Sequence, residues 1–438
     1  MSQIYRPNQP EQLIELIQWA VSSDTPLAVR GTGSKSTIGR PVQAEHILDL
    51  GGFSGITQYD PVELVLTAGA GTTMSEIIEL LGKQNQMLAF EPPDYSGIFG
   101  FQGNADNNHN TDKPGSTSGT LGGTLAGNIS GPRRFFAGAA RDHFLGFKAV
   151  SGRGEPFKSG GRVVKNVTGF DLSKLMAGSW GTLGALWEVT VKVLPMPEQT
   201  RTLLIFDLTP QQAIGAMTVA VSSPHSVSGA AYLPAILASC SSVSYIASTG
   251  DSSITALRVE GPGPSVTYRL EALKKMFNSE NHGLEELHGR NSAILWREVG
   301  NLSLFGNLSV LGSTAQVDNQ SLYGNPQDQI WRLSLPPASA CKTASALEAL
   351  GVTRWLFDQA GGTLWLSCPQ ENINADQVRS TLASNHGHAT LWRAEQSLRQ
   401  RTAVFQPQQE SLAALTRRVK RSFDPQGILN PGRMYADL

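Results

Sequence analysis

Hydrophobic and polar residues follow clear periods in the first 85 residues of the chain. In residues 11–21 the apolar positions lie mostly three or four apart, which predicts an amphipathic helix: Leu13, Ile14, Ile17, Ala20 and Val21. Residues 74–81 predict a second helix, opened by Thr72 and Thr73. Short apolar runs predict strands at residues 27–29, 47–50 and 63–67. This part of the chain is therefore alternating α and β structure.

Residues 160–193 carry the most informative single pattern. Val189, Val191 and Val193 alternate with polar residues, which is typical of a half-buried strand. Directly before this strand stand Gly178, Gly181 and Gly184. Glycines at the start of a rigid element remove side chains, so a flat or anionic ligand can lie against bare backbone N–H groups. The alternative is a tight hairpin entry, in which the glycines only serve positive φ.

The pattern changes along the rest of the chain. Residues 91–141 are rich in glycine, asparagine, proline and serine, and residues 104–112 predict an exposed loop. A strand is expected at 144–150, and Pro195-Met196-Pro197 marks the main domain boundary. Beyond it we expect strands at 202–206 and 330–335, helices at 211–221, 267–276, 343–350 and 408–422, and an extended tail.

Composition and charge exclude several classes of protein. The chain has 438 residues, enough for two or three domains, and a net charge of −1, which gives no electrostatic case for nucleic acid. No run of apolar residues is long enough for a membrane span. Three widely spaced cysteines give neither a disulfide framework nor the spacing of a zinc or iron–sulfur site. A basic cluster at 417–421 is interpreted as the solvated face of a late helix.

Two further glycine-rich segments precede the strand that contains Val189. Residues 30–36 follow a predicted strand as a dinucleotide-binding turn would, but Ser36 stands where the third glycine belongs. A Walker loop is excluded because the lysine of this segment follows a serine. The other segment is a loop expected over 118–138. Together they suit FAD, whose pyrophosphate needs several backbone donors, with Arg30 and Lys35 as cationic complement.

The same segments carry a resemblance to known flavoproteins. Residues 30–34, 120–124 and 178–184 resemble the FAD-binding domain of the vanillyl-alcohol oxidase and p-cresol methylhydroxylase superfamily. More narrowly, the chain is similar to the FAD-binding E subunits of bacterial glycolate oxidases in residues 130–134, 164–171, 331–337, 387–394 and 428–433. The similarity spans nearly the whole chain and is most specific in its first 200 residues.

The resemblance implies an α+β fold, with a two-subdomain FAD-binding domain of the p-cresol methylhydroxylase type and an α+β cap domain. We expect the FAD-binding domain over residues 1–195, with subdomains at about 1–60 and 61–195. The cap or substrate domain is expected over 196–400, and residues 401–438 are expected to form a helix and tail that return to the FAD-binding domain.

The resemblance also implies which residues hold the cofactor. They are Arg30, Gly31, Thr32, Gly33, Ser34, Lys35, Thr120, Leu121, Gly122, Gly123, Thr124, Gly127, Asn128, Gly138, Asp142, Gly178, Gly181, Thr182, Gly184, Val189 and Asn430. We expect non-covalent FAD, because the first segment has neither His nor Cys and only His109 and His143 flank the second. Relative to the family, residues 94–116 look like an insertion.

A role in a complex follows from the same resemblance. It implies a subunit that oxidises glycolate, a 2-hydroxy acid, to glyoxylate and passes electrons on through its flavin. The expected partners are a second, larger flavoprotein subunit and an iron–sulfur subunit. We expect a cytoplasmic location, with a peripheral position at the inner membrane through the complex as the alternative.

Catalytic residues are less well defined by the sequence. Oxidising a 2-hydroxy acid needs a cation for the carboxylate, a base for the hydroxyl proton and flavin N5 to accept a hydride. The candidate cations are Arg133, Arg134, Arg354 and Arg393, and the candidate bases are His386 and His388. No metal site is expected. Two alternatives stay open: an accessory subunit with a structural flavin, and a stand-alone FAD-dependent hydroxy-acid or alcohol dehydrogenase.

Overall fold

The computed structural model describes residues 3–99, 118–161, 169–278, 282–306, 328–382 and 386–438. The motif residues 164–168, the loop expected at 104–112, His109 and most of the expected insertion therefore lie outside the described residues. The helices are α1 (Pro10–Ser22), α2 (Met74–Gly82), α3 (Ser96–Phe99), α4 (Leu121–Ala126), α5 (Arg134–Ala137), α6 (Ala140–His143), α7 (Leu172–Met176), α8 (Pro210–Ser222), α9 (Ala235–Ala238), α10 (Ser244–Ala247), α11 (Gly263–Phe277), α12 (Gly289–Asn301), α13 (Ala340–Glu348), α14 (Ala375–Ser380), α15 (Gln396–Arg401) and α16 (Glu410–Phe423).

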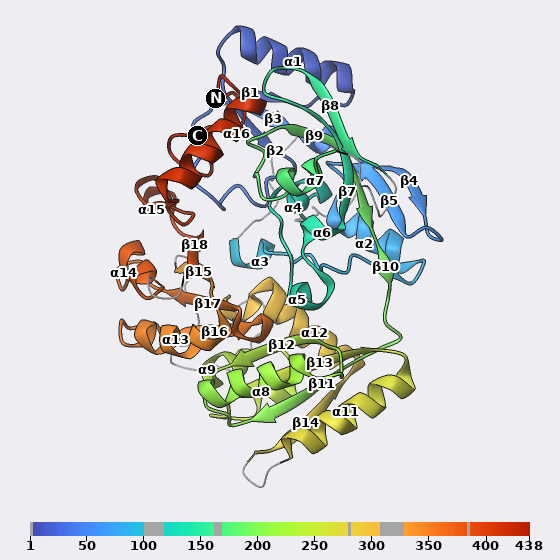
Figure 1. Cartoon of the computed structure of the whole chain (residues 1–438), viewed down its shortest axis with the longest axis vertical. Coiled ribbons are helices and arrows are strands. Elements are labelled where there is room, and N and C mark those ends of the chain that lie inside the picture. The colour runs from blue at the N-terminus through green and yellow to red at the C-terminus, as the bar shows by residue number, and fades with distance from the viewer. Residues whose placement is uncertain (1–2, 100–117, 162–168, 279–281, 307–327, 383–385) are drawn as a thin grey trace.

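A small parallel sheet begins the fold. Its order is β1 (Gln3–Tyr5), β3 (His46–Asp49) and β2 (Leu27–Arg30). The apolar face of α1 packs against it through Leu13 and Ile17, and Leu429 from the far end of the chain pairs with Leu27. The helix and the two strands predicted here are confirmed. Figure 1 shows the two chain ends side by side near this sheet.

A five-stranded antiparallel sheet follows. Its order is β4 (Ile56–Asp60), β5 (Val65–Gly69), β9 (Ala185–Lys192), β7 (Phe144–Val150) and β8 (Pro156–Gly160). The strand expected at 144–150 is confirmed. The alternating strand is confirmed as β9. It lies in the centre of the sheet, and one of its polar residues is buried as well: Thr190 forms a hydrogen bond with Thr67 at 2.9 Å. A short pair, β6 (Gln86–Met87) with β10 (Leu194–Pro195), ends this region.

An eight-stranded antiparallel sheet contains most of the second half of the chain. Its order is β14 (Leu284–His288), β11 (Gln199–Phe206), β13 (Ile254–Gly261), β12 (Val227–Leu233), β16 (Arg354–Asp358), β17 (Thr363–Cys368), β15 (Gln329–Ser334) and β18 (His388–Arg393). Leu203 and Ile205 face one core, with α8, α11 and α13, whereas Leu204 and Phe206 face another. Both faces are covered, which explains the unbroken apolar run of β11.

The second face of this sheet packs against the first half of the chain. Tyr95, Ile129 and Trp180 share one core with Trp365 and Trp392 of the sheet. Figure 1 shows the eight-stranded sheet in the lower part of the molecule and the two earlier sheets above it. The mixed fold agrees with the predicted α+β class, and the helices and strands predicted beyond residue 197 each overlap an observed one.

Two local expectations were wrong. The glycine-rich segment 118–138 is not a loop, because Thr120 caps α4 by accepting a hydrogen bond from Gly123 N, and α5 follows. The basic cluster is not entirely solvated. Lys420 is buried, and its Nζ donates to Asp424 at 2.6 Å and to the Thr182 carbonyl at 2.8 Å.

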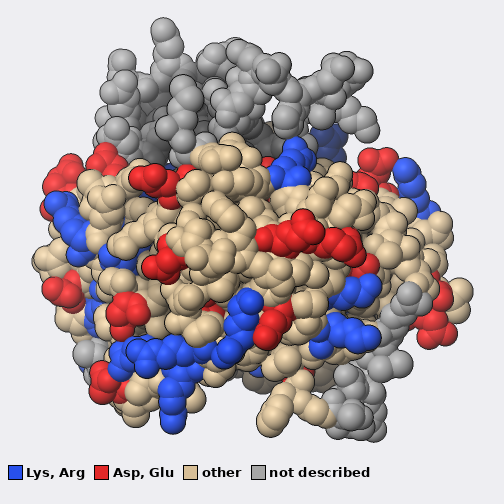
Figure 2. Space-filling model, turned by 90° about the horizontal axis from the view of Figure 1, so that it is seen from above, with Lys and Arg blue, Asp and Glu red and all other residues tan. Residues whose placement is uncertain are grey.

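The outer surface carries mixed charge. On the face seen in Figure 2, acidic and basic side chains of the described residues lie among uncharged ones, and one row of basic side chains runs along the lower left of the view. On α16, Arg417 pairs with Glu410 and Asp437 and does not stand free. Within the described ranges, no helix combines the length and the apolar character that crossing a bilayer requires.

Candidate functional site

A cleft of about 400 Å³ lies where β2, α4, the turn before β9 and the end of the chain meet. Segment 28–37 lines it continuously, and segments 120–126 and 180–186 supply the opposite wall. The chain end closes it with Gln396, Arg399, Asn430 and Arg433. The three glycine-rich segments, far apart in sequence, therefore meet at one site.

Close backbone approach explains the glycines at this cleft. A Cβ at Gly31 would lie 2.6 Å from Thr120 Oγ1, and one at Gly122 would lie 2.7 Å from Ala70 Cβ. Gly33 and Gly181 have backbone φ angles of +80° and +73°, which residues other than glycine rarely adopt. Gly178 also has a positive φ, +85°. Gly184 does not, but a Cβ there would lie 3.2 Å from Met176 Cε and 3.3 Å from the Val150 carbonyl oxygen.

All charged residues that line the cleft, among the described residues, are basic. Arg30, Lys35, Arg399 and Arg433 line it, and no acidic residue does so among the described residues. Burial lowers the pKa of Lys35 to about 8, against the attraction of Asp94, and burial lowers the pKa of Arg433 to about 10, with Arg399 adding to the effect. The Nε atoms of Arg30 and Arg433 are buried without a hydrogen-bond partner. This arrangement suits an anionic ligand.

Asn430 ties the chain end to the cleft walls. Its Oδ1 accepts from Val29 N at 2.8 Å, and its Nδ2 donates to the Trp180 carbonyl at 2.8 Å. Arg433 reaches the same region, where its NH2 donates to the Lys35 carbonyl at 2.7 Å and its guanidinium lies over the Trp180 ring. The tail therefore joins two of the three glycine-rich segments.

The predicted cofactor residues divide into two groups. Those that line the cleft are Arg30, Gly31, Thr32, Gly33, Ser34, Lys35, Thr120, Gly122, Gly123, Gly181, Gly184 and Asn430. Those that do not are Leu121, Thr124, Gly127, Asn128, Gly138, Asp142, Gly178, Thr182 and Val189. Several of the second group hold the walls. Asp142 accepts from Ala139 N, Thr182 Oγ1 donates to Ser179 O, and Val189 lies in the core.

Sequence reasoning missed several residues of the cleft. Trp180 lines the cleft and belongs to the recognised motif 178–184. A large aromatic residue between Gly178 and Gly181 could have indicated a ligand-facing position. Arg433 lies in the recognised tail. Gln396 and Arg399 carried no signal, because only the return of α15 to the first half of the chain brings them here, where Arg399 NH1 donates to the Gly39 carbonyl.

The cleft residues fit FAD. Unpartnered cationic donors complement a pyrophosphate, and close backbone approach leaves bare N–H groups for it. Val29, Ile47, Leu50 and Leu186 supply an apolar lining for the rest of the molecule. When bound, this cofactor supplies a hydride acceptor.

A second, smaller cavity lies beside the cleft, and we call it the Arg332 cavity. Its lining comes from both halves of the chain: Tyr95, Asn128, Ile129, Ser130, Gly131, Gly300, Arg332, Asp358, Gln359, Trp365 and Trp392. The rings of Trp180 and Trp392, 6.3 Å apart, stand between it and the cleft. Burial raises the pKa of Asp358 to about 7 and also raises the pKa of the Tyr95 hydroxyl.

The predicted catalytic residues line neither the cleft nor the Arg332 cavity. His388 begins β18 and His386 lies two residues before it, and both are exposed. Arg354 NH2 donates to the Leu304 carbonyl, and Arg393 donates to the carbonyls of Asp328 and Ile98. None of these four lines the cleft or the Arg332 cavity.

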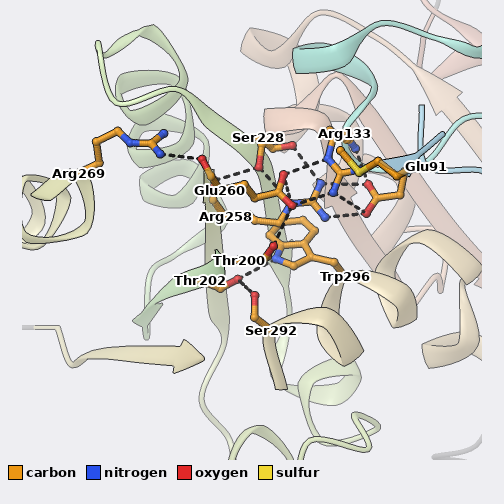
Figure 3. A network of polar contacts seen from close by, with 11 residues as sticks. Glu91, Arg133, Thr200, Thr202, Ser228, Arg258, Glu260, Arg269, Ser292 and Trp296 are labelled. Carbon is orange, nitrogen blue, oxygen red and sulfur yellow. Dashed lines mark hydrogen bonds and ion pairs between the residues drawn. The ribbon is translucent and has the colours of Figure 1, made fainter. Parts of the chain in front are cut away.

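Arg133 belongs to a buried ion-pair network that joins the two halves of the chain (Figure 3). Its guanidinium donates to both oxygens of Glu260 at 2.7 and 3.0 Å, and Arg258 donates to both oxygens of Glu91 at 2.7 and 3.0 Å. Arg258 also lies over the Trp296 ring at 4.6 Å. Burial alone would raise the pKa of Glu260, but Arg258 and Arg133 hold it at about 2. The guanidinium of Arg133 therefore has a structural role, because it is paired with Glu260.

Comparison with known proteins agrees with this geometry. Residues 1–118 match the FAD binding domain family, and residues 398–434 match the C-terminal domain of FAD linked oxidases. The chain is 31% identical to the glycolate oxidase subunit GlcE of Escherichia coli K12, over 98% of each protein. It is 22% identical to the glycolate oxidase subunit GlcD of Bacillus subtilis, over 99% of this chain and 88% of that one.

Solved structures show the same fold. The structure of p-cresol methylhydroxylase with bound substrate superposes with a TM-score of 0.70 at 15% identity, covering 99% of this chain and 88% of that one. The α+β fold of the p-cresol methylhydroxylase type, predicted from the sequence, is thereby confirmed. The chain belongs to the family of FAD-linked oxidoreductases that includes the glycolate oxidase subunit GlcE.

Proposed function

We propose that this chain is the FAD-binding subunit of a complex that oxidises glycolate to glyoxylate and passes the electrons to an iron–sulfur subunit. One observation carries the proposal: three glycine-rich segments and the chain end build a cleft with four cationic side chains and no acidic one among the described residues. Similarity to GlcE over 98% of the chain supports the choice of glycolate. A second, larger flavoprotein subunit is the other expected partner.

FAD is proposed to lie in the cleft without a covalent bond. Many members of the superfamily attach their flavin through a His or Cys, and the described lining residues include neither. The predicted residues that line the cleft, together with Arg399 and Arg433, would contact the cofactor, and the remaining predicted residues would hold its walls. The domain division at about residues 195 and 400 is part of the same proposal, as is a cytoplasmic location with membrane contact only through partner subunits.

The test begins with the purified chain. We expect a yellow protein that releases its flavin into the supernatant on acid precipitation; flavin that stays with the precipitate would contradict non-covalent binding. Anaerobic titration with glycolate should bleach the flavin only after the partner subunits are added. Bleaching of the isolated chain would favour a stand-alone dehydrogenase. Flavin that stays oxidised in the turning-over complex would favour a structural cofactor.

A further inference from the structure

The last residues of the chain form one side of the cleft. We call residues 424–433, which directly follow α16, the strap. Two of its side chains, Asn430 and Arg433, line the cleft. Figure 1 shows α16 and the C-terminus next to the three-stranded sheet, and Leu429 of the strap pairs with Leu27 of β2. The segment that closes the cleft therefore comes from the opposite end of the sequence to the strand that it meets.

The strap pairs with an outer strand of the three-stranded sheet. That strand is β2, which runs directly into segment 30–36 of the cleft. Leu27 N donates to the Ile428 carbonyl at 2.8 Å, and Asn430 N donates to the Leu27 carbonyl at 3.0 Å. Pairing at the edge of a sheet can open locally while the strands behind it stay in place. The strap can therefore detach without unfolding the sheet.

A buried ion pair fixes the start of the strap. It joins Lys420 of α16 to Asp424, both buried, and we call these two residues the pin. Lys420 Nζ donates to Asp424 Oδ2 at 2.6 Å and to the Leu429 carbonyl at 2.9 Å. Its third hydrogen bond goes to the Thr182 carbonyl at 2.8 Å, which uses all three donors of the ammonium group. The pin therefore connects α16, the strap and the 178–184 turn.

The carboxylate of the pin also shapes the strap. Asp424 Oδ1 accepts from Ile428 N at 2.9 Å, and Oδ2 accepts from Leu429 N at 2.8 Å. Gly152, after β7, leaves room for this carboxylate, because a Cβ there would lie 2.3 Å from Asp424 Cγ. Neither pin residue lines the cleft. The pin can therefore influence a bound cofactor only through the segments that it holds.

We propose that the strap is a detachable closure of the cleft, that FAD enters and leaves only while the strap is detached, and that Lys420 and Asp424 are the positioning residues that hold it in place. The inference deepens the proposed function and rests on it for the place of FAD in the cleft. Detachment removes Asn430 and Arg433 from the lining and opens one side of the cleft at the same time. The strap should in turn be held down when FAD is bound, because a ligand stabilises the conformation that it contacts.

The first experiment measures flavin release from the FAD-loaded chain. The test variant combines Lys420→Met with Asp424→Asn, so that no unpaired charge stays buried. After dilution, flavin fluorescence should show release at least about 10-fold faster than in the parent, as expected for the loss of a hydrogen bond between charged groups. Lys83→Met with Glu79→Gln makes equivalent changes in an exposed pair of the same spacing and should release flavin as the parent does. Equal release from the pin variant and the parent would overturn the inference.

Hydrogen exchange followed by mass spectrometry separates the strap from a general loss of stability. Bound FAD should slow exchange in residues 424–433 and 27–30 of the parent. The pin variant should exchange faster in these two segments, while β13 in the centre of the eight-stranded sheet exchanges as before. Gly152→Ala crowds Asp424 without removing a charge and should give the same pattern. Faster release with an equal acceleration in β13 would contradict the inference, because the whole fold would then be loosened.

Uptake of FAD by the flavin-free chain tests the order of events. The rate should level off at high FAD concentration, because detachment of the strap then limits it, and the limit should be higher in the pin variant. A rate that keeps rising in proportion to FAD concentration would mean that the cleft is open with the strap in place, which would overturn the inference. A parent chain that takes up no flavin would overturn the proposed function and this inference with it. Uptake and release that do not depend on the pin would overturn the inference alone.

Discussion

The cleft and the Arg332 cavity differ in how their residues come together. The cleft takes its lining from short continuous segments such as 28–37, where neighbouring residues lie on one wall. The Arg332 cavity takes Arg332, Trp365 and Trp392 singly from β15, β17 and β18, residues 358–359 from the end of β16, and residues 128–131 from the first half of the chain. Local motifs can therefore encode the first site, whereas the second exists only once long-range strand pairing is complete.

The difference also appears in the electrostatics. The cleft gathers cations that solvent or an anionic ligand must satisfy. The region between the two halves of the chain pairs its cations with carboxylates: Arg133 with Glu260 and Arg258 with Glu91. The cleft is lined by cations alone and suits a large anionic cofactor, whereas the Arg332 cavity contains both a cation and a carboxyl group, Arg332 and Asp358.

The largest expected effect comes from breaking the buried ion-pair network that joins the two halves of the chain. Arg258→Met leaves Glu91 and Glu260 partly unpaired in a buried site, which should lower the free energy of unfolding by about 3–5 kcal/mol. Urea denaturation measures this loss. Lys83→Met, which removes an exposed pair with Glu79, is the control and should change stability by less than about 1 kcal/mol. Equal losses in both variants would contradict the assigned burial of the network.

Asp358→Asn should change stability in a way that depends on pH. Burial raises the pKa of Asp358 from 3.8 to about 7, so the folded protein disfavours its charged form. The stability that the protonated carboxyl contributes is complete below pH ~4 and is lost as pH rises through about 7. The variant should therefore match the parent near pH ~4 and be more stable by about 2–4 kcal/mol near pH ~8. Thermal unfolding at the two pH values measures the difference, and a gain that does not depend on pH would contradict the assignment.

Gly122→Ala tests the locally encoded site. The new Cβ would lie 2.7 Å from Ala70 Cβ and 2.8 Å from the Ala70 carbonyl, so the backbone must shift. We expect a loss of about 1–3 kcal/mol and weaker flavin retention on gel filtration. Gly215→Ala, on the exposed face of α8 with no atom within 4 Å of the new Cβ, should instead stabilise by about 0.5–1 kcal/mol. Normal flavin retention in Gly122→Ala would remove this glycine from the cofactor site.

The smallest effect concerns a helix cap beside the cleft. Thr73 Oγ1 accepts from Glu76 N at 3.3 Å and opens α2. Thr73→Ala should cost about 1 kcal/mol, while Thr73→Ser should cost little because the hydroxyl acceptor remains. Chemical denaturation of both variants measures the cap. Equal losses would indicate that the methyl group of Thr73, and not its hydroxyl, is what matters.

The elements that could be predicted from the sequence are those with local signals. The helix at 11–21, the strand at 144–150 and the strand that contains Val189 are all found in place, because apolar periodicity reports the buried face directly. The helices within 118–138 were not predicted, because the glycines there outweighed the Thr120 cap that begins α4. Short helices with one capping bond leave little periodic pattern to detect.

The candidate sites divide in the same way. Arg30, Lys35 and the glycines were identified because they stand beside one another or in recognisable motifs. Arg399 was missed although it lines the same cleft, because its guanidinium contacts the carbonyl of Gly39, which lies 360 positions earlier in the chain. No local pattern in the sequence reports a contact over that separation.

The sequence by itself was enough to identify the family and the segments that build the cleft. Its glycine-rich segments, the alternating strand and the tail motif identify an FAD-linked family, because each is a short stretch whose backbone must take one conformation. Only the tertiary structure decided which charged side chains meet. Arg332, Asp358 and Tyr95 become neighbours through strand register and the packing of two halves, and burial then sets their pKa values.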